Sequence, residues 1–409
     1  MNEREEADYK DILDILDVIG NNSNGDSSRS LSKKTTVENR LNALRPVYGY
    51  GYNSYRTGLK NLGSTCYLNS VVQSLVHTEP IINKLVEIGK LTNCKLEGLC
   101  GELAFISKIM NSGEYRHVSP IKLREELAKV DQCFGESEQQ DAHETLVWML
   151  DRMEKEMKTL DENERLIENT FDGKVTARRE CTKCKEKYDA TDVFRYLQIE
   201  IPESQKKVKT LEMCIDDHMK TEKVDDKRCT ADGCKNSTNA IRTKTLTKIP
   251  EVLIINLKRF RTSENKKKGS RVRWQATKVY SHVKAPIHLD MRKYTKESNC
   301  EYQLYSVINH KGGTASGHYT TVCYEAANKE WVCYDDDKVD NWDENDLEEN
   351  KQAYIYFYKR KDNFSTEEER KKEVQVIEEG AGDMSEARSE AHSRELGGNQ
   401  RRGRWGVRC

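Results

Sequence analysis

The stretch Gly58–Leu75, GLKNLGSTCYLNSVVQSL, decides how this chain is interpreted, because its two halves predict different structures. The residues before Cys66 are loop and N-cap types, and those after it are apolar at helical spacing (Leu68, Val71, Val72 and Leu75). We therefore expect Cys66 in the first turn of an amphipathic helix, where free N–H groups and the helix dipole favour a nucleophilic thiolate. Taken alone, Cys66 fits a buried core cysteine better, because free cysteine is among the most buried residue types.

A second stretch, far along the chain, supplies a base and an orienting acid. Residues 302–324 and 331–334 alternate apolar and polar positions around a glycine-rich loop, which predicts antiparallel strands. His318 opens the strand after this loop, and Asp335 closes the next one. If these strands are neighbours, the carboxylate lies beside the imidazole and can complete a Cys–His–Asp set. Taken alone, His318 is an ordinary half-exposed histidine.

These two stretches resemble the cysteine and histidine boxes of the ubiquitin-specific proteases, a papain-like family that cleaves ubiquitin from proteins. Three further segments match the family in order and spacing: Gln139–Glu144, Phe171–Lys174 and Ile249–Phe260. The resemblance covers about residues 57–360.

The spacing of apolar residues agrees with the fold that the resemblance implies. Helical spacing comes first and strand spacing follows, which predicts an α+β domain with a helical lobe against an antiparallel sheet. The family has a helical thumb, an antiparallel-sheet palm and zinc-bearing β fingers, here expected at about 171–250. The catalytic domain is expected at 57–360, between an N-terminal extension (1–56) and a charged C-terminal tail (361–409), both mostly disordered.

The resemblance assigns catalytic roles to four residues. It implies that Cys66 is the nucleophile, that His318 is its base and that Asp335 orients the histidine. Asp336 is expected to be a secondary acidic residue that matters less, because adjacent residues on a strand point to opposite faces and only one can face the histidine.

The resemblance also indicates how the substrate is held. Asn61 stands where the family has an oxyanion asparagine, and such a donor contributes about 3 kcal/mol to the stability of the transition state. An ordinary turn asparagine is almost as good an interpretation of Asn61. Substrate-binding roles fall to Asp141, Gln140 and Gly317, although Asp141 also fits a charge at a helix N-terminus.

Two cysteine pairs interrupt the strand region. Two residues separate Cys181 from Cys184, whereas four separate Cys229 from Cys234, where the family usually has two. One structural zinc per chain, bound by all four thiolates, is favoured over free thiols at a relict site, because free thiols on adjacent hairpins would be reactive. Four protein ligands leave no position for water or substrate, so we expect no catalytic cofactor.

The function implied is that of a thiol-dependent deubiquitinase, which hydrolyses isopeptide and peptide bonds after the C-terminal glycine of ubiquitin. Its partners would be ubiquitin and ubiquitinated proteins. Two alternatives stay open: a protease for another ubiquitin-like modifier, and an inactive ubiquitin-binding scaffold. Recognition of the modifier depends on surfaces that a single sequence does not identify.

The composition limits the setting of this function. Lys and Arg total 68 against 69 Asp and Glu, so a net charge of −1 gives no basis for nucleic-acid binding. The sequence has no apolar run of about 18 residues that would span a membrane, and its start lacks a signal-peptide pattern. We therefore expect a cytoplasmic or nuclear protein whose 13 cysteines are thiols and metal ligands. The terminal tails are candidate binding segments for regulatory partners.

Overall fold

The computed structural model describes residues 47–48, 56–91, 98–162, 164–202, 208–225, 229–231, 234, 239–265, 273–314 and 316–361. The chain divides into two units, Met1–Arg360 and Lys361–Cys409. All elements named below belong to the first unit. Nearly all of the N-terminal extension and of the C-terminal tail lies outside the described residues. Among the helices that are described, none has both the length and the apolar character needed to cross a membrane.

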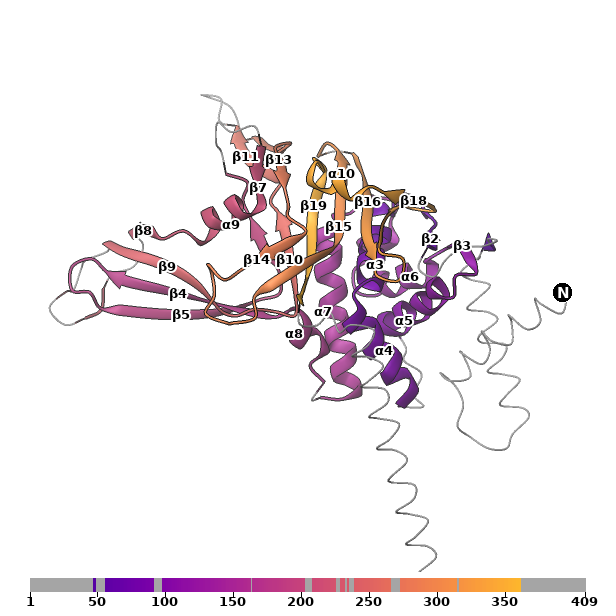
Figure 1. The fold of residues 1–409 in the computed structure, drawn as a ribbon, viewed down its shortest axis with the longest axis horizontal. Helices are drawn as coiled ribbons and strands as arrows, with labels where there is room; N and C mark the ends of the chain where they lie inside the picture. Colours follow the sequence, from indigo (N-terminus) through magenta and orange to yellow (C-terminus); the bar gives the residue numbers. More distant parts are fainter. Residues whose placement is uncertain are drawn as a thin grey trace, which may run out of the picture. The chain divides into compact units, whose positions relative to one another are not determined.

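A helical lobe forms the first half of the unit, as the sequence spacing predicts (Figure 1). Its helices are α3 (Cys66–Val76), α4 (Glu79–Leu91), α5 (Gly98–Asn111), α6 (Ile121–Ala128), α7 (Ala142–Leu160) and α8 (Leu166–Phe171), with a 3-10 turn at Gln132–Gly135. Every residue of α3 is buried, because α5, α7 and the strands β15 (Glu301–Gly312) and β16 (Gly317–Glu325) surround it. A small sheet of β1 (Val47–Tyr48), β3 (Tyr115–Val118) and β2 (Gly58–Leu59) leads into α3.

The central sheet has the strand order β18-β17-β16-β15-β19-β10-β6, and β14 also pairs with β15. Its other strands are β6 (Leu197–Ile199), β10 (Val252–Leu257), β14 (His288–Asp290), β17 (Glu330–Asp335), β18 (Lys338–Trp342) and β19 (Ala353–Arg360). Only β10 and β6 pair in parallel among these described strands.

Both faces of the central sheet are covered. Alternate residues of β10 belong to different apolar clusters: Ile254 packs with the helical lobe, and Ile255 packs with α9 (Leu211–Met219). This alternation follows from the strand period of two, and it explains why every residue of β10 is buried and all but Asn256 are apolar. The strand that carries His318, β16, is therefore anchored in a sheet with two cores.

A long four-stranded sheet, with order β5-β4-β9-β8, extends away from the helices (Figure 1). Its strands are β4 (Gly173–Cys181), β5 (Lys187–Phe194), β8 (Glu222–Asp225) and β9 (Asn239–Lys248), within the range expected for the fingers. Smaller pairs are β11 (Phe260–Asn265) with β12 (Arg273–Lys278) and β13 (His282–Lys284) with β7 (Val208–Thr210); α10 (Glu344–Glu348) follows β18.

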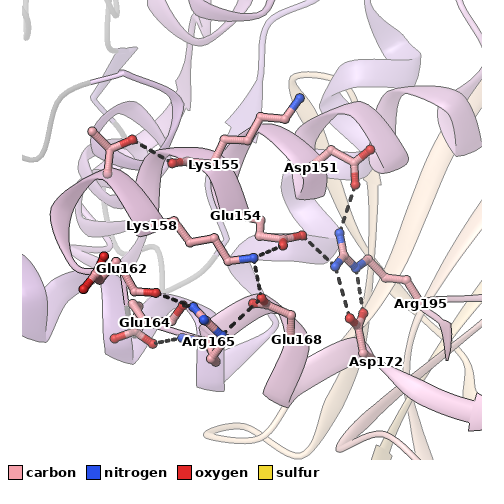
Figure 2. Close-up of polar contacts among 11 residues, drawn as sticks. Asp151, Glu154, Lys155, Lys158, Glu162, Glu164, Arg165, Glu168, Asp172 and Arg195 are labelled. Atoms are coloured by element: carbon pink, nitrogen blue, oxygen red, sulfur yellow. Dashed lines mark hydrogen bonds and ion pairs between the residues drawn. The ribbon is translucent and has the colours of Figure 1, made fainter.

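An ion-pair cluster joins the base of this sheet to the helical lobe (Figure 2). Arg195, between β5 and β6, donates to Asp172 at 2.8 and 3.2 Å and to Glu154 of α7 at 2.8 Å. It also donates to Asp151 of α7 at 2.9 Å, while the Arg195 side chain is only 16% exposed. Removing one partner from such a mostly buried set leaves charges uncompensated, so the cluster holds the sheet and α7 together.

Candidate active site

Cys66 is the first residue of α3, as the spacing predicts. The loop before it is held by Asn61, whose Oδ1 accepts hydrogen bonds from the backbone N–H groups of Gly63 and Thr65 at 3.0 Å each. The hydroxyl of Thr65 in turn accepts from the N–H of Leu62 at 2.8 Å. The nucleophile therefore follows a loop with fixed hydrogen bonds, and Cys66 is 2% exposed.

Gln139 connects the nucleophile to the glycine before His318. Its Nε2 donates to the Cys66 Sγ at 3.0 Å and to the carbonyl of Gly317 at 2.8 Å, and its Oε1 accepts from the N–H of Gly317 at 3.2 Å. From the sequence, a role is predicted for the neighbouring Gln140 and none for Gln139; both line the cleft. Their shared motif was the available signal, but it does not tell which of the two amides faces the thiol.

His318 and Asp335 meet as the strand pattern predicts. Antiparallel pairing of β16 with β17 places the imidazole beside the carboxylate, and Nε2 of His318 lies 2.5 Å from Oδ1 of Asp335. Nδ1 of the ring is then the nitrogen left for proton transfer. His318 and Cys66 line one cleft, so the structure brings nucleophile, base and orienting acid to the same place.

Asp336 faces the nucleophile loop. Its carboxylate accepts from Nδ2 of Asn61 at 2.9 Å and from Nδ2 of Asn69 at 2.8 Å, and its carbonyl accepts from the N–H of Leu59 at 2.8 Å. Asn61 retains a second amide hydrogen, which can be donated to an oxyanion. Asp336 therefore orients the predicted oxyanion donor, a contact that the sequence argument did not identify.

The cleft beside these residues is lined by both acidic and basic side chains. Its lining includes Glu138, Asp141, Glu144 and Glu200, and also Lys258, Arg259 and Arg261. Asp141 is the N-cap of α7: its Oδ1 accepts from the N–H of His143 at 2.8 Å and its Oδ2 accepts from the hydroxyl of Tyr354 at 2.9 Å. The interpretation of Asp141 as a helix cap thus describes its contacts, and Asp141 also lines the cleft. Gly317 lines the cleft as well.

Burial decides the protonation of the nucleophile. Desolvation raises the pKa of the Cys66 thiol, although hydrogen bonds from the N–H of Tyr319 and from Gln139 lower it in part. The thiolate that a helix N-terminus would favour is therefore not the resting form. Attack by this thiol would need a base, and His318 lines the same cleft.

The four predicted zinc ligands lie together at the far end of the four-stranded sheet. The Sγ atoms of Cys181 and Cys234 are 3.6 Å apart, as are those of Cys184 and Cys229, and all four lie within 4.8 Å of one another. A tetrahedron with Zn–S bonds of about 2.3 Å has edges of about 3.8 Å, so this spacing fits one zinc ion despite the wider second pair.

Comparison with known proteins places this geometry in a family. Residues 57–358 match the family described as ubiquitin carboxyl-terminal hydrolase. Ubiquitin carboxyl-terminal hydrolase Usp2 of Drosophila melanogaster is 28% identical, over 74% of this chain and 34% of its own length. Ubiquitin carboxyl-terminal hydrolase 42 of Homo sapiens is 30% identical, over 74% of this chain and 23% of its own length. The chain thus spans about a third or less of these two relatives.

Solved structures show the same fold. The SAGA Ubp8/Sgf11/Sus1/Sgf73 DUB module bound to ubiquitin aldehyde contains a chain with a TM-score of 0.64 and 24% identity, covering 77% of this chain and 71% of that one. The same module with a cysteine-to-alanine variant of Ubp8, bound to monoubiquitin, contains a chain with a TM-score of 0.63 and 24% identity. The match covers 83% of this chain and 76% of that one. Because the family match extends over most of the sequence, this chain belongs to the ubiquitin carboxyl-terminal hydrolase family.

Proposed function

We propose that this protein is a thiol-dependent deubiquitinase that hydrolyses isopeptide and peptide bonds after the C-terminal glycine of ubiquitin. The observation that carries the proposal is that Cys66, hydrogen-bonded to Gln139, and His318, hydrogen-bonded to Asp335, line one cleft in a chain of this family. Its substrates and partners would be ubiquitin and ubiquitinated proteins, and its location the cytoplasm or nucleus. The terminal segments are proposed as binding sites for regulatory partners.

The geometry supports acyl transfer in two steps. Nδ1 of His318 takes the proton of Cys66, and the thiolate attacks the carbonyl carbon of the last glycine. The free amide hydrogen of Asn61 stabilises the oxyanion. When the tetrahedral intermediate collapses, the C–N bond breaks, His318 protonates the departing lysine amine, and a thioester to Cys66 remains. Water, deprotonated by His318, then hydrolyses the thioester and restores the thiol.

Two other functions can be separated from this one by a single set of probes. A protease for another ubiquitin-like modifier would react with a C-terminal vinyl sulfone of that modifier in preference to ubiquitin vinyl sulfone. An inactive scaffold would bind ubiquitin and form no adduct. The assembled Cys66, His318 and Asp335 argue against the scaffold.

Cys66→Ala should reduce hydrolysis of a ubiquitin–amide reporter to the background rate, a loss of roughly a millionfold, because Cys66 is the one thiol among the described residues that line the cleft. Binding of ubiquitin, measured by titration calorimetry, should be retained. Cys133→Ala is the matched control, because Cys133 is a half-buried thiol outside the residues that line the cleft. Turnover by Cys66→Ala would refute the thiol mechanism.

Alkylation of Cys66 by iodoacetamide should become faster as pH rises from 7 to 9. The raised pKa means that the thiol form predominates below it, so the thiolate fraction and the rate grow about tenfold per pH unit. Mass spectrometry of the Cys66 peptide measures this rate. A rate that is already constant at pH 7 would instead show a thiolate in the resting enzyme.

We further propose one structural zinc bound by Cys181, Cys184, Cys229 and Cys234, supported by the tetrahedral spacing of their sulfur atoms. Elemental analysis should find about one zinc per chain, and Cys229→Ser and Cys234→Ser should both lose it and melt at lower temperature. Cys300→Ser, at a buried cysteine outside this cluster, should keep the metal. A zinc-free wild-type protein of unchanged stability would show that the second pair no longer binds metal.

A further inference from the structure

Lys278, the last residue of β12, is a cation whose nitrogen contacts neutral acceptors. Its Nζ donates to the carbonyl of His310 at 2.8 Å and to the carbonyl of Gly312 at 2.9 Å, and it lies 2.7 Å from Nδ1 of His310. It also lies 5.9 Å from the ring centre of Phe260 and 5.4 Å from that of Tyr280. Within the described part of the chain, no carboxylate forms an ion pair with Lys278.

The hydrogen bond from Lys278 to Nδ1 of His310 requires a neutral imidazole ring. Burial, and next the charge of Lys278, lower the pKa of His310 to about 4, so the ring is neutral near pH 7 and Nδ1 can accept. Burial also lowers the pKa of Lys278 to about 8, which leaves the ammonium as the major form at pH 7. Its three N–H donors therefore meet three acceptors, and the ammonium is fully satisfied.

The acceptors of Lys278 stand at the turn that presents the catalytic histidine. Gly312 has a φ of +105° and pairs with Gly317 where the chain turns from β15 into β16. Gly317 packs so closely on His310 that a Cβ there would lie 2.0 Å from its Nε2. Gly317 is hydrogen-bonded through both backbone groups to Gln139, the donor to Cys66. A continuous set of contacts thus runs from Lys278 to the nucleophile.

We propose that Lys278 is a positioning residue for the reaction. Its ammonium fixes the turn between β15 and β16, and this turn places Gly317 against Gln139 beside Cys66. The role rests on the proposed function, because it concerns the same site. Side-chain packing alone would not require this charge, since a methionine of similar length could fill the same space. Three directed hydrogen bonds to His310 and Gly312, at the end of β15 that leads into the turn, do require it.

The test compares two variants. Lys278→Met keeps the length of the side chain but removes its charge and its N–H donors, whereas Lys278→Arg keeps the charge and the donors. Lys278→Met should lower kcat/KM on a ubiquitin–amide reporter by about a hundredfold, mainly through kcat, because small displacements of reacting groups have effects of this size. Lys278→Arg should recover at least part of this loss. Amide hydrogen exchange should rise in residues 311–314, 316 and 317 and remain unchanged in β10.

A second readout needs no substrate. Because the Gln139 hydrogen bond lowers the pKa of Cys66, disturbing it should slow alkylation of Cys66 by iodoacetamide at pH 8. This readout tests the role of Lys278 even if the wild-type protein does not hydrolyse ubiquitin, an outcome that would defeat the proposed function alone. Lys293→Met is the matched control, because Lys293 also lies over a tyrosine ring, at 5.8 Å from that of Tyr294, and pairs with Asp216 outside the cleft.

Wild-type turnover and alkylation in Lys278→Met would overturn the proposal. A loss of activity accompanied by increased amide exchange throughout the central sheet would also overturn it, because Lys278 would then stabilise the whole fold and not the turn in particular. A loss in Lys278→Met with local exchange at the turn and slower alkylation supports it, provided Lys293→Met behaves like the wild-type protein.

Discussion

Two adjacent carboxylates connect the two halves of the site, and the geometry of the catalytic residues depends on them. Asp335 holds the ring of His318, and Asp336 holds the amides of Asn61 and Asn69 in the loop and helix that carry Cys66. Asn61 and Asp336 are 275 residues apart in the chain. Because the two aspartates follow each other at the end of β17, the position of the base and that of the oxyanion donor are set by one turn.

The helix and the sheet are held in register by buried polar contacts. The hydroxyl of Thr321 in β16 donates to the carbonyl of Ser70 in α3 at 2.9 Å, and the hydroxyls of Ser74 and Ser306 lie 2.9 Å apart. A buried hydroxyl that loses its partner costs about 1–3 kcal/mol, so sliding α3 along the sheet is unfavourable. Apolar packing alone would tolerate such a shift more easily, because it is not directional.

Local patterns in the sequence predicted where the candidate site residues lie, and the family resemblance assigned their roles. The helical period after Cys66 gave the start of α3, and the strand period gave the neighbouring strands that bring His318 to Asp335. The cysteine pairs predicted the cluster in the four-stranded sheet. The helix start and the strand pairing need only the spacing of residues close together in the chain, whereas joining the two cysteine pairs into one cluster also drew on the family resemblance.

The missed features all depend on contacts between distant segments. Gln139 reaches Cys66 across 73 residues, and Lys278 reaches His310 across 32, so neither contact follows from local spacing. The protonation of Cys66 was also misjudged, because the helix N-terminus is visible in the sequence while the depth of burial is not. In the folded chain, desolvation is the larger effect.

The most direct test of this account is the kcat of Asp336→Ala on a ubiquitin–amide reporter, measured beside Asp335→Ala. If Asp336 orients the oxyanion donor, its loss should lower kcat by about a hundredfold, as loss of an oxyanion-hole donor does, with little change in KM. Asp335→Ala should also be impaired, through the orientation of His318. Wild-type kcat in Asp336→Ala would contradict the claim that this turn sets both halves of the site.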